Sequence, residues 1–158
     1  MRILLSLPLV LLAACAPAAD TAPMDTASAT DWEPRIREAN EVLLNEGDLQ
    51  RIPEFFAESY VSHAAGAQAQ GHDAIRGFLE AITTAFPDLQ VDVEVLVTEG
   101  DRVAWIRNHR GTHEGEFMGV PGTGRVLTWQ DMAVTRYDGT MIVEEWGVSG
   151  LPGVIQVP

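Results

Sequence analysis

The chain has 158 residues, 46% of them hydrophobic, and a formal net charge of −13. This composition suits a globular domain with its own core, and the negative charge argues against nucleic acid or anionic lipid headgroups as partners. All ten basic residues are arginine, which excludes Schiff-base catalysis by lysine.

The first residues have the pattern of a secretory signal. Arg2 precedes an apolar run, residues 3–14, that is too short to span a bilayer stably. The run ends in Leu-Ala-Ala-Cys, which resembles a bacterial lipobox, where the cysteine receives a diacylglycerol group and the chain is cut before it. Cys15 is the only cysteine, so an intramolecular disulfide is excluded. Ordinary signal cleavage in the alanine-rich segment that follows is the alternative.

These features predict the domain organisation. We expect a lipoprotein signal peptide over residues 1–14 and a flexible tether over 15–30, because that segment is rich in Ala, Thr, Pro and Asp and cannot form a core. The folded domain then covers residues 31–158. The lipid on Cys15 would anchor it in the bacterial cell envelope, facing the periplasm or the exterior.

Helices are predicted in the first half of the domain. Thr30 or Asp31 can cap a helix that Gly47-Asp48 ends. A short helix over 52–56 and an extended segment over 60–63 follow, and the small residues of 64–71 indicate a loop. Asp73 can cap a third helix with one apolar stripe, formed by Ile75, Phe78, Leu79, Ile82 and Phe86.

Strands are predicted in the second half, where the hydrophobic period changes to two. Val91, Val93, Val95 and Val97 alternate with other residues, and further strands are expected over 103–113, 125–137 and 141–149. Asp138-Gly139 is a strong hairpin signal between the last two. Helices followed by an antiparallel meander indicate an α+β fold, with the helices on one face of a curved sheet.

Short phrases along the domain resemble one protein family. They include residues 45–49, 85–89, 99–104, 111–121, 123–125, 136–139 and 142–146. Their order and spacing resemble the SnoaL-like polyketide cyclase, or ester cyclase, family of the nuclear transport factor 2-like superfamily. The resemblance implies a cone-shaped fold that encloses a pocket between helices and a mostly antiparallel sheet.

The resemblance also implies an activity, the cofactor-free intramolecular aldol condensation of the characterised cyclases. Their acid/base aspartate on the last strand corresponds to Gly147 here. A supporting histidine corresponds to Ala133, and an amide partner corresponds to Asp131. The main catalytic carboxylate of the family is therefore absent from its expected position, which puts the aldol cyclase activity in doubt.

Strand alternation supplies other acid/base candidates. If Asp131 faces the pocket, Trp129 shares its face, and Glu145 shares a face with Gly147 on the last strand. Asp131 and Glu145 could meet across adjacent strands, and each carboxylate would raise the pKa of the other. The alternative is a carboxylate that is solvated or paired with an arginine.

Two histidines lie where the family often has histidine. His63 follows the first extended segment and His113 ends the second strand, so either could contact a ligand or hydrogen-bond a loop. His109 and His113 are four residues apart, but on a strand this spacing spans roughly 13 Å, too far for one metal ion. We expect neither a metal nor a cofactor.

The sequence leaves several functions open. One is a cofactor-independent enzyme acting on a small apolar carbonyl or ester compound through Asp131 or Glu145, with His63, His113 and Trp129 contacting the ligand. Another is an envelope protein that binds a small apolar molecule without converting it, as Gly147 would suggest. A third is an interaction protein whose cone is filled by side chains, and a homodimer also stays open.

Overall fold

The computed structural model describes residues 31–64 and 67–156, so the predicted signal peptide, the tether and Cys15 lie outside the described residues. The helices of the first half are α1 (Glu33–Asn40), continued by a π-helical turn η1 (Glu41–Asn45), then the 3₁₀ turn η2 (Leu49–Arg51), α2 (Ile52–Phe55) and α3 (Gly71–Ala85). A short helix, α4 (Leu151–Ile155), follows the last strand.

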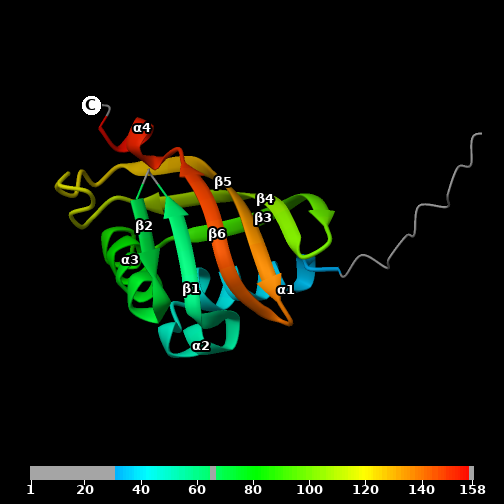
Figure 1. The fold of residues 1–158 in the computed structure, drawn as a ribbon. Coiled ribbons are helices and arrows are strands. Elements are labelled where there is room, and N and C mark those ends of the chain that lie inside the picture. Colours follow the sequence, from blue (N-terminus) through cyan, green and yellow to red (C-terminus); the bar gives the residue numbers. More distant parts are fainter. Residues whose placement is uncertain (1–30, 65–66, 157–158) are drawn as a thin grey trace, which may run out of the picture.

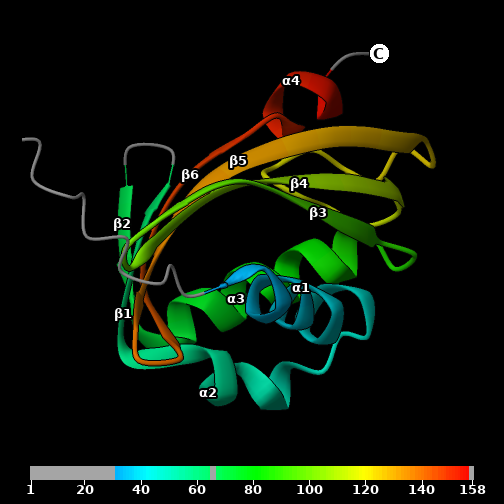
Figure 2. The same ribbon diagram turned by 90° about the vertical axis from the view of Figure 1, so that its right-hand side faces the viewer.

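The strands form one curved sheet. They are β1 (Phe56–Ala64), β2 (Ala67–Gln70), β3 (Gln90–Glu99), β4 (Arg102–Thr112), β5 (Val126–Asp138) and β6 (Met141–Ser149), in the order β2-β1-β6-β5-β4-β3 (Figure 1). Neighbours are antiparallel except β1 and β6, which are parallel. Figure 2 shows the sheet arching over α1 and α3, which confirms the predicted α+β cone.

The core lies between the helices and the inner face of the sheet. The predicted stripe of α3 buries Leu79 and Ile82, and α1 buries Ile36. Near the end of β5, next to the hairpin that leads to β6, Trp32 stacks on Tyr137 with ring centroids 4.2 Å apart. This contact attaches the start of the domain to the sheet.

Several details of the predicted elements are wrong. The helix α3 begins at Gly71, so Asp73 lies inside its first turn and does not cap it. Residues 67–70 form the edge strand β2 rather than part of a loop; all four are exposed, so burial imposes no alternation that the sequence could reveal. The alternation in β3 breaks after Val95, because a bulge before Val97 shifts the register. Val97 is consequently 58% exposed, although the predicted apolar series included it.

The segment Gly111-Thr-His-Glu-Gly-Glu closes the end of the helical layer. The amides of Glu114 and Gly115 both donate to the Ala85 carbonyl, at 2.9 and 3.1 Å. A Cβ at Gly115 would lie 2.8 Å from the Thr84 carbonyl oxygen and 3.0 Å from Ala85 Cα. Glycine is therefore needed here because two stretches of backbone approach closely.

This packing predicts opposite effects for two glycine substitutions. Gly115→Ala should lower the free energy of unfolding by about 1–3 kcal/mol, since the methyl group overpacks the end of α3. Gly77→Ala, in an exposed part of α3 with no atom within 4 Å of the added methyl, should raise it by about 0.5–1 kcal/mol. Urea denaturation of both variants checks the difference, and equal effects would contradict this packing.

Candidate functional site

A cavity of about 590 Å³ lies between the inner face of the sheet and the helices. The cone is therefore open rather than filled. Its wall is mostly apolar and comes from α1, η1, α3, α4, the five strands β1, β2, β4, β5 and β6, and the loop between β4 and β5. The polar side chains on that wall are few, and those of the described residues are Asn40, Tyr60, Ser62, Arg107, Asp131, Glu145 and Ser149.

Strand register arranges the cavity wall in rows. Arg107, Asp131 and Ser149 lie in one row across β4, β5 and β6, and the next row holds Trp105, Ala133 and Gly147. Thr135 and Glu145 occupy the row after that. The small side chains at Ala133 and Gly147 leave open space between the two acidic rows.

Glu145 is held by a short chain of hydrogen bonds. Trp105 Nε1 donates to Thr135 Oγ1 at 2.9 Å, and Thr135 Oγ1 donates to Glu145 Oε2 at 3.2 Å. Because Oε2 accepts this bond, the proton of the neutral acid belongs on Oε1. Burial raises the pKa of Glu145, and the charge of Asp131 adds to the rise while Arg107 and Thr135 oppose it. The environment thus favours a protonated Glu145.

Asp131 is paired with a buried histidine. His109 Nε2 lies 3.0 Å from Asp131 Oδ2, and its ring stacks on Trp129 with centroids 4.6 Å apart. Burial lowers the pKa of His109, so the ring is neutral and Nε2 carries the hydrogen donated to Asp131. Asp131 Oδ1 is buried with no hydrogen-bond partner among the described residues.

The pKa of Asp131 moves opposite to that of Glu145. Burial by itself raises the pKa of Asp131, but the hydrogen bond from His109, with help from Ser149 and Arg107, outweighs burial and lowers it. Asp131 is therefore ionised at neutral pH. Two carboxyl groups in one cavity with pKa values displaced in opposite directions form an acid and a base.

Arg107 brings a positive charge to the cavity wall. Its Nε donates to Asn40 Oδ1 at 2.7 Å, and Asn40 Nδ2 in turn donates to the Ile36 carbonyl at 2.8 Å. The guanidinium carbon lies 4.6 Å from the centre of the Trp105 ring. Arg107 thus joins β4 to α1 in a fixed orientation.

The structure separates the predicted site residues. Asp131 and Glu145 line the cavity, whereas His63, His113 and Trp129 are not among the described residues that line it. His113 is fully buried, stacks on Phe86 and lies 3.3 Å from Thr123 Oγ1 through its Nδ1.

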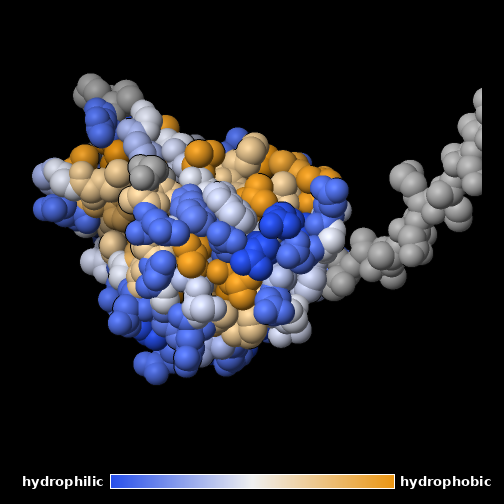
Figure 3. All heavy atoms as spheres, viewed as in Figure 1, coloured by the Kyte–Doolittle hydropathy of each residue, from blue (hydrophilic) through white to orange (hydrophobic). Residues whose placement is uncertain are grey.

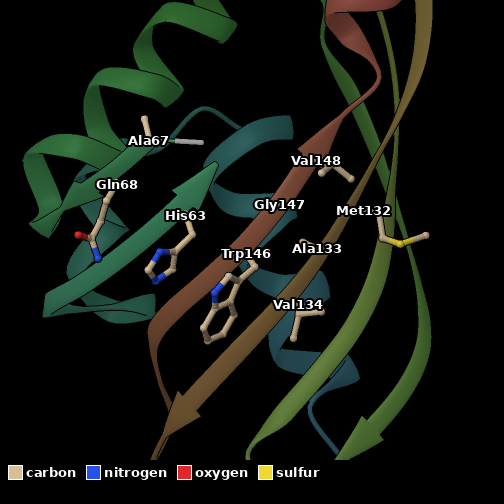
Figure 4. Close-up of a pocket in the computed structure, with 9 residues that line it drawn as sticks. All are labelled: His63, Ala67, Gln68, Met132, Ala133, Val134, Trp146, Gly147 and Val148. Atoms are coloured by element: carbon tan, nitrogen blue, oxygen red, sulfur yellow. The ribbon is translucent and has the colours of Figure 1, made fainter. Parts of the chain in front are cut away.

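His63 lies on the outer face of the sheet. Its ring stacks on Trp146 with ring centroids 5.2 Å apart (Figure 4). The Nε2 atom of His63 lies 2.9 Å from Glu144 Oε1. A shallow hollow here is lined by His63, Gln68, Met132, Val134, Trp146 and Val148, among others. Figure 3 shows hydrophobic patches among hydrophilic groups on this side. Because the hollow is open and holds no carboxylate, the internal cavity is the better candidate for chemistry.

Sequence reasoning missed His109 and Arg107 as site residues. The alternation that placed Asp131 on the inner face of β5 also applies to β4, where Trp105, Arg107 and His109 share a face. That signal was available, but the bond from His109 to Asp131 runs diagonally across the register and depends on side-chain packing.

Neither a metal site nor a membrane-spanning helix is found in the described part of the chain. Among residues 31–64 and 67–156, no three His, Cys, Asp or Glu side chains are placed to hold a metal ion together. No helix in the same residues is long and apolar enough to cross a membrane.

Comparison with known proteins gives a consistent result. Residues 35–156 match the SnoaL-like polyketide cyclase family. AclR of Streptomyces galilaeus, a proposed hydroxylase, is 28% identical with a TM-score of 0.70, over 83% of this chain and 100% of AclR. IdmH of Streptomyces antibioticus, a proposed polyketide cyclase, is 31% identical with a TM-score of 0.67, over 76% of this chain and 92% of IdmH. No functionally curated protein matches.

The raised pKa of Glu145 predicts a pH-dependent stability. The folded state binds this proton more tightly than the unfolded state, so the contribution is complete below the ordinary value of 4.5 and is lost as pH rises towards the folded pKa. Glu145→Gln removes the carboxyl group, so the variant does not lose this stability as pH rises. The free energy of unfolding of the variant, relative to wild type, should therefore increase as pH rises from 4 to 8 in denaturation curves.

Glu144→Gln is the matched control on the opposite face of β6. The hydrogen bond with His63, with help from Arg136, lowers the pKa of Glu144, so its contribution is present above 4.5 and is lost as pH falls. The stability of this variant relative to wild type should decrease as pH rises to about 4.5 and then stay level. The same trend in both variants would contradict the assigned environments.

Proposed function

The chain belongs to the SnoaL-like polyketide cyclase family, and on that basis we propose that it is a cofactor-independent acid/base enzyme acting on a small apolar carbonyl or ester compound. Asp131 is the general base and Glu145 is the general acid. One observation carries the proposal: both side chains line one largely apolar cavity, and their pKa values are displaced in opposite directions.

The apolar wall supports the choice of substrate. A cavity of about 590 Å³ with few polar groups favours a compact apolar molecule that presents one or two oxygen atoms to them. Thr135 and His109, which do not line the cavity, hydrogen-bond to the two carboxyl groups and fix their orientation, and Trp105 bonds to Thr135. The residues thus have the order that proton transfer needs, with reacting groups at the cavity and supporting groups behind them.

A binding protein without activity is the second candidate, and Gly147 favours it. A Cβ at Gly147 would meet only the Met132 carbonyl oxygen, at 3.8 Å, so the packing leaves room for a side chain. Glycine at this position is therefore a chemical difference from the family's cyclases and not a steric requirement.

Deuterium exchange separates the two candidates. The full-length chain, incubated in D₂O with a panel of small ketones and esters, should introduce deuterium at the carbon next to the carbonyl group, as detected by NMR. Asp131→Asn should slow this exchange by at least about a hundredfold, and Glu145→Gln should slow it by about ten- to a hundredfold. Glu144→Gln should leave the rate unchanged.

Binding of a compound without exchange at any pH would support the binding protein instead. Exchange that survives in both cavity variants would also contradict the proposed roles of Asp131 and Glu145.

We also propose that the enzyme acts at the bacterial cell envelope, anchored through a lipid on Cys15. The support is the apolar run that ends at the only cysteine in the chain. The homodimer that the sequence leaves open stays a prediction.

The anchor has its own test. Cys15→Ala should abolish incorporation of a labelled fatty acid and release the protein from the membrane fraction, because no thiol remains to be acylated. Ala16→Ser, one residue further along, serves as the control and should stay labelled. Labelling of the Cys15→Ala variant would overturn the lipid anchor.

A further inference from the structure

Arg107 is the one cationic side chain among the described residues that line the cavity, and the proton-transfer roles above give it no function. The Nε of Arg107 donates to Asn40, and the guanidinium carbon lies over the ring of Trp105. No carboxylate among the described residues lies within ion-pair distance of it, since Asp131 bonds to His109 and Glu145 bonds to Thr135. The terminal nitrogens of its guanidinium group therefore have donors to offer a ligand.

We infer that Arg107 binds the carbonyl oxygen of the substrate and stabilises the negative charge that forms there, and that the substrate is a neutral, enolisable carbonyl compound rather than a carboxylic acid. The inference rests on the proposed acid/base function. It adds Arg107 as a third reacting group and specifies that the substrate is uncharged.

The charges in the cavity support a neutral substrate. With Arg107 cationic, Asp131 ionised and His109 and Glu145 neutral, these groups sum to zero in the absence of ligand. A carboxylate ligand would add an uncompensated negative charge beside Asp131, which an apolar cavity penalises. A neutral ketone or ester adds none.

Proton transfer leaves the net charge of the cavity unchanged. Asp131 Oδ1 takes the proton from the carbon next to the carbonyl group, so that the C–H bond breaks and Asp131 becomes neutral. The electron pair of that bond forms a carbon–carbon double bond, and the π electrons of the carbonyl group move to its oxygen. The negative charge thus passes from Asp131 to an oxygen held by Arg107, and Glu145 Oε1–H can donate to the same oxygen.

The geometry fits this transfer. Arg107 and Asp131 are direct partners in the register of β4 and β5 and line the same cavity, so base and cation lie side by side on one wall. The bond to Asn40, which is only 6% exposed, fixes the guanidinium fork before a substrate arrives. Such preorganisation is what makes an oxyanion site effective.

Equilibrium binding of 4-nitrophenolate, an enolate mimic detected by its visible absorbance, tests the role of Arg107 without turnover. Asp131→Asn represents the protonated base, so in the full-length chain it should bind the phenolate about tenfold or more tighter than wild type. Adding Arg107→Met to the Asp131→Asn variant should weaken phenolate binding by about tenfold or more relative to Asp131→Asn alone. Binding of neutral 4-nitroanisole should be unchanged in all three proteins, and Arg136→Met, on the outer face, should have no effect.

Several results would contradict these assignments. Phenolate binding that survives Arg107→Met, or that is absent from Asp131→Asn, overturns the assignment. Wild type that binds 4-nitrobenzoate more tightly than 4-nitroanisole overturns the neutral substrate class. If Arg107→Met does not fold, Arg107→Lys replaces it. Lysine keeps the positive charge but lacks the paired N–H donors of the guanidinium group. Full phenolate affinity in Arg107→Lys would therefore also contradict the role of Arg107. Phenolate bound through Arg107 without deuterium exchange would refute the acid/base function alone.

Discussion

The guanidinium group of Arg107 is the constraint on which the cavity depends. A cation in an apolar wall must be supported by its neighbours, and Asn40 and the Trp105 ring provide that support from α1 and from β4 itself. Its charge opposes the rise in the pKa of Glu145 and contributes to the lowered pKa of Asp131. One side chain therefore joins the helices to the sheet and influences the protonation of both carboxyl groups.

The cavity itself results from the sizes of a few side chains on a curved sheet. Ala133 and Gly147 are neighbours in the register of β5 and β6, and Ala64 of β1 continues the row next to Gly147. Larger side chains in that row would fill the space between the acidic rows. Protein interiors normally pack without voids of this size, so the open row forgoes stabilising contacts. Such a loss is usual where a structure keeps room for a ligand.

Much of this fold was predictable because strand alternation depends only on local sequence. It gave the limits of β4, β5 and β6 to within about one residue and put Glu145 on the same face as Gly147, while the family resemblance indicated which faces point into the pocket. The side on which His63 lies was not predictable. It depends on the parallel pairing of β1 with β6, where Ser62 is the partner of Glu145 and His63 is the partner of Trp146. No local pattern encodes a register between segments so far apart in the chain.

The position of Glu145 also bears on what the proposed enzyme would accept. The resemblance places the family's aspartate at Gly147, and Glu145 lies two residues earlier on the same face of β6. A carboxylate can thus be lost at one position and supplied at the other without leaving the cavity, but the acid moves roughly 7 Å along the strand. Under the proposed function, the carbon that loses its proton to Asp131 must lie at the row of Arg107 and Asp131, while the acid reaches the carbonyl oxygen from the row of Thr135 and Glu145. We therefore expect a substrate that spans these rows and differs in shape from one bound beside residue 147.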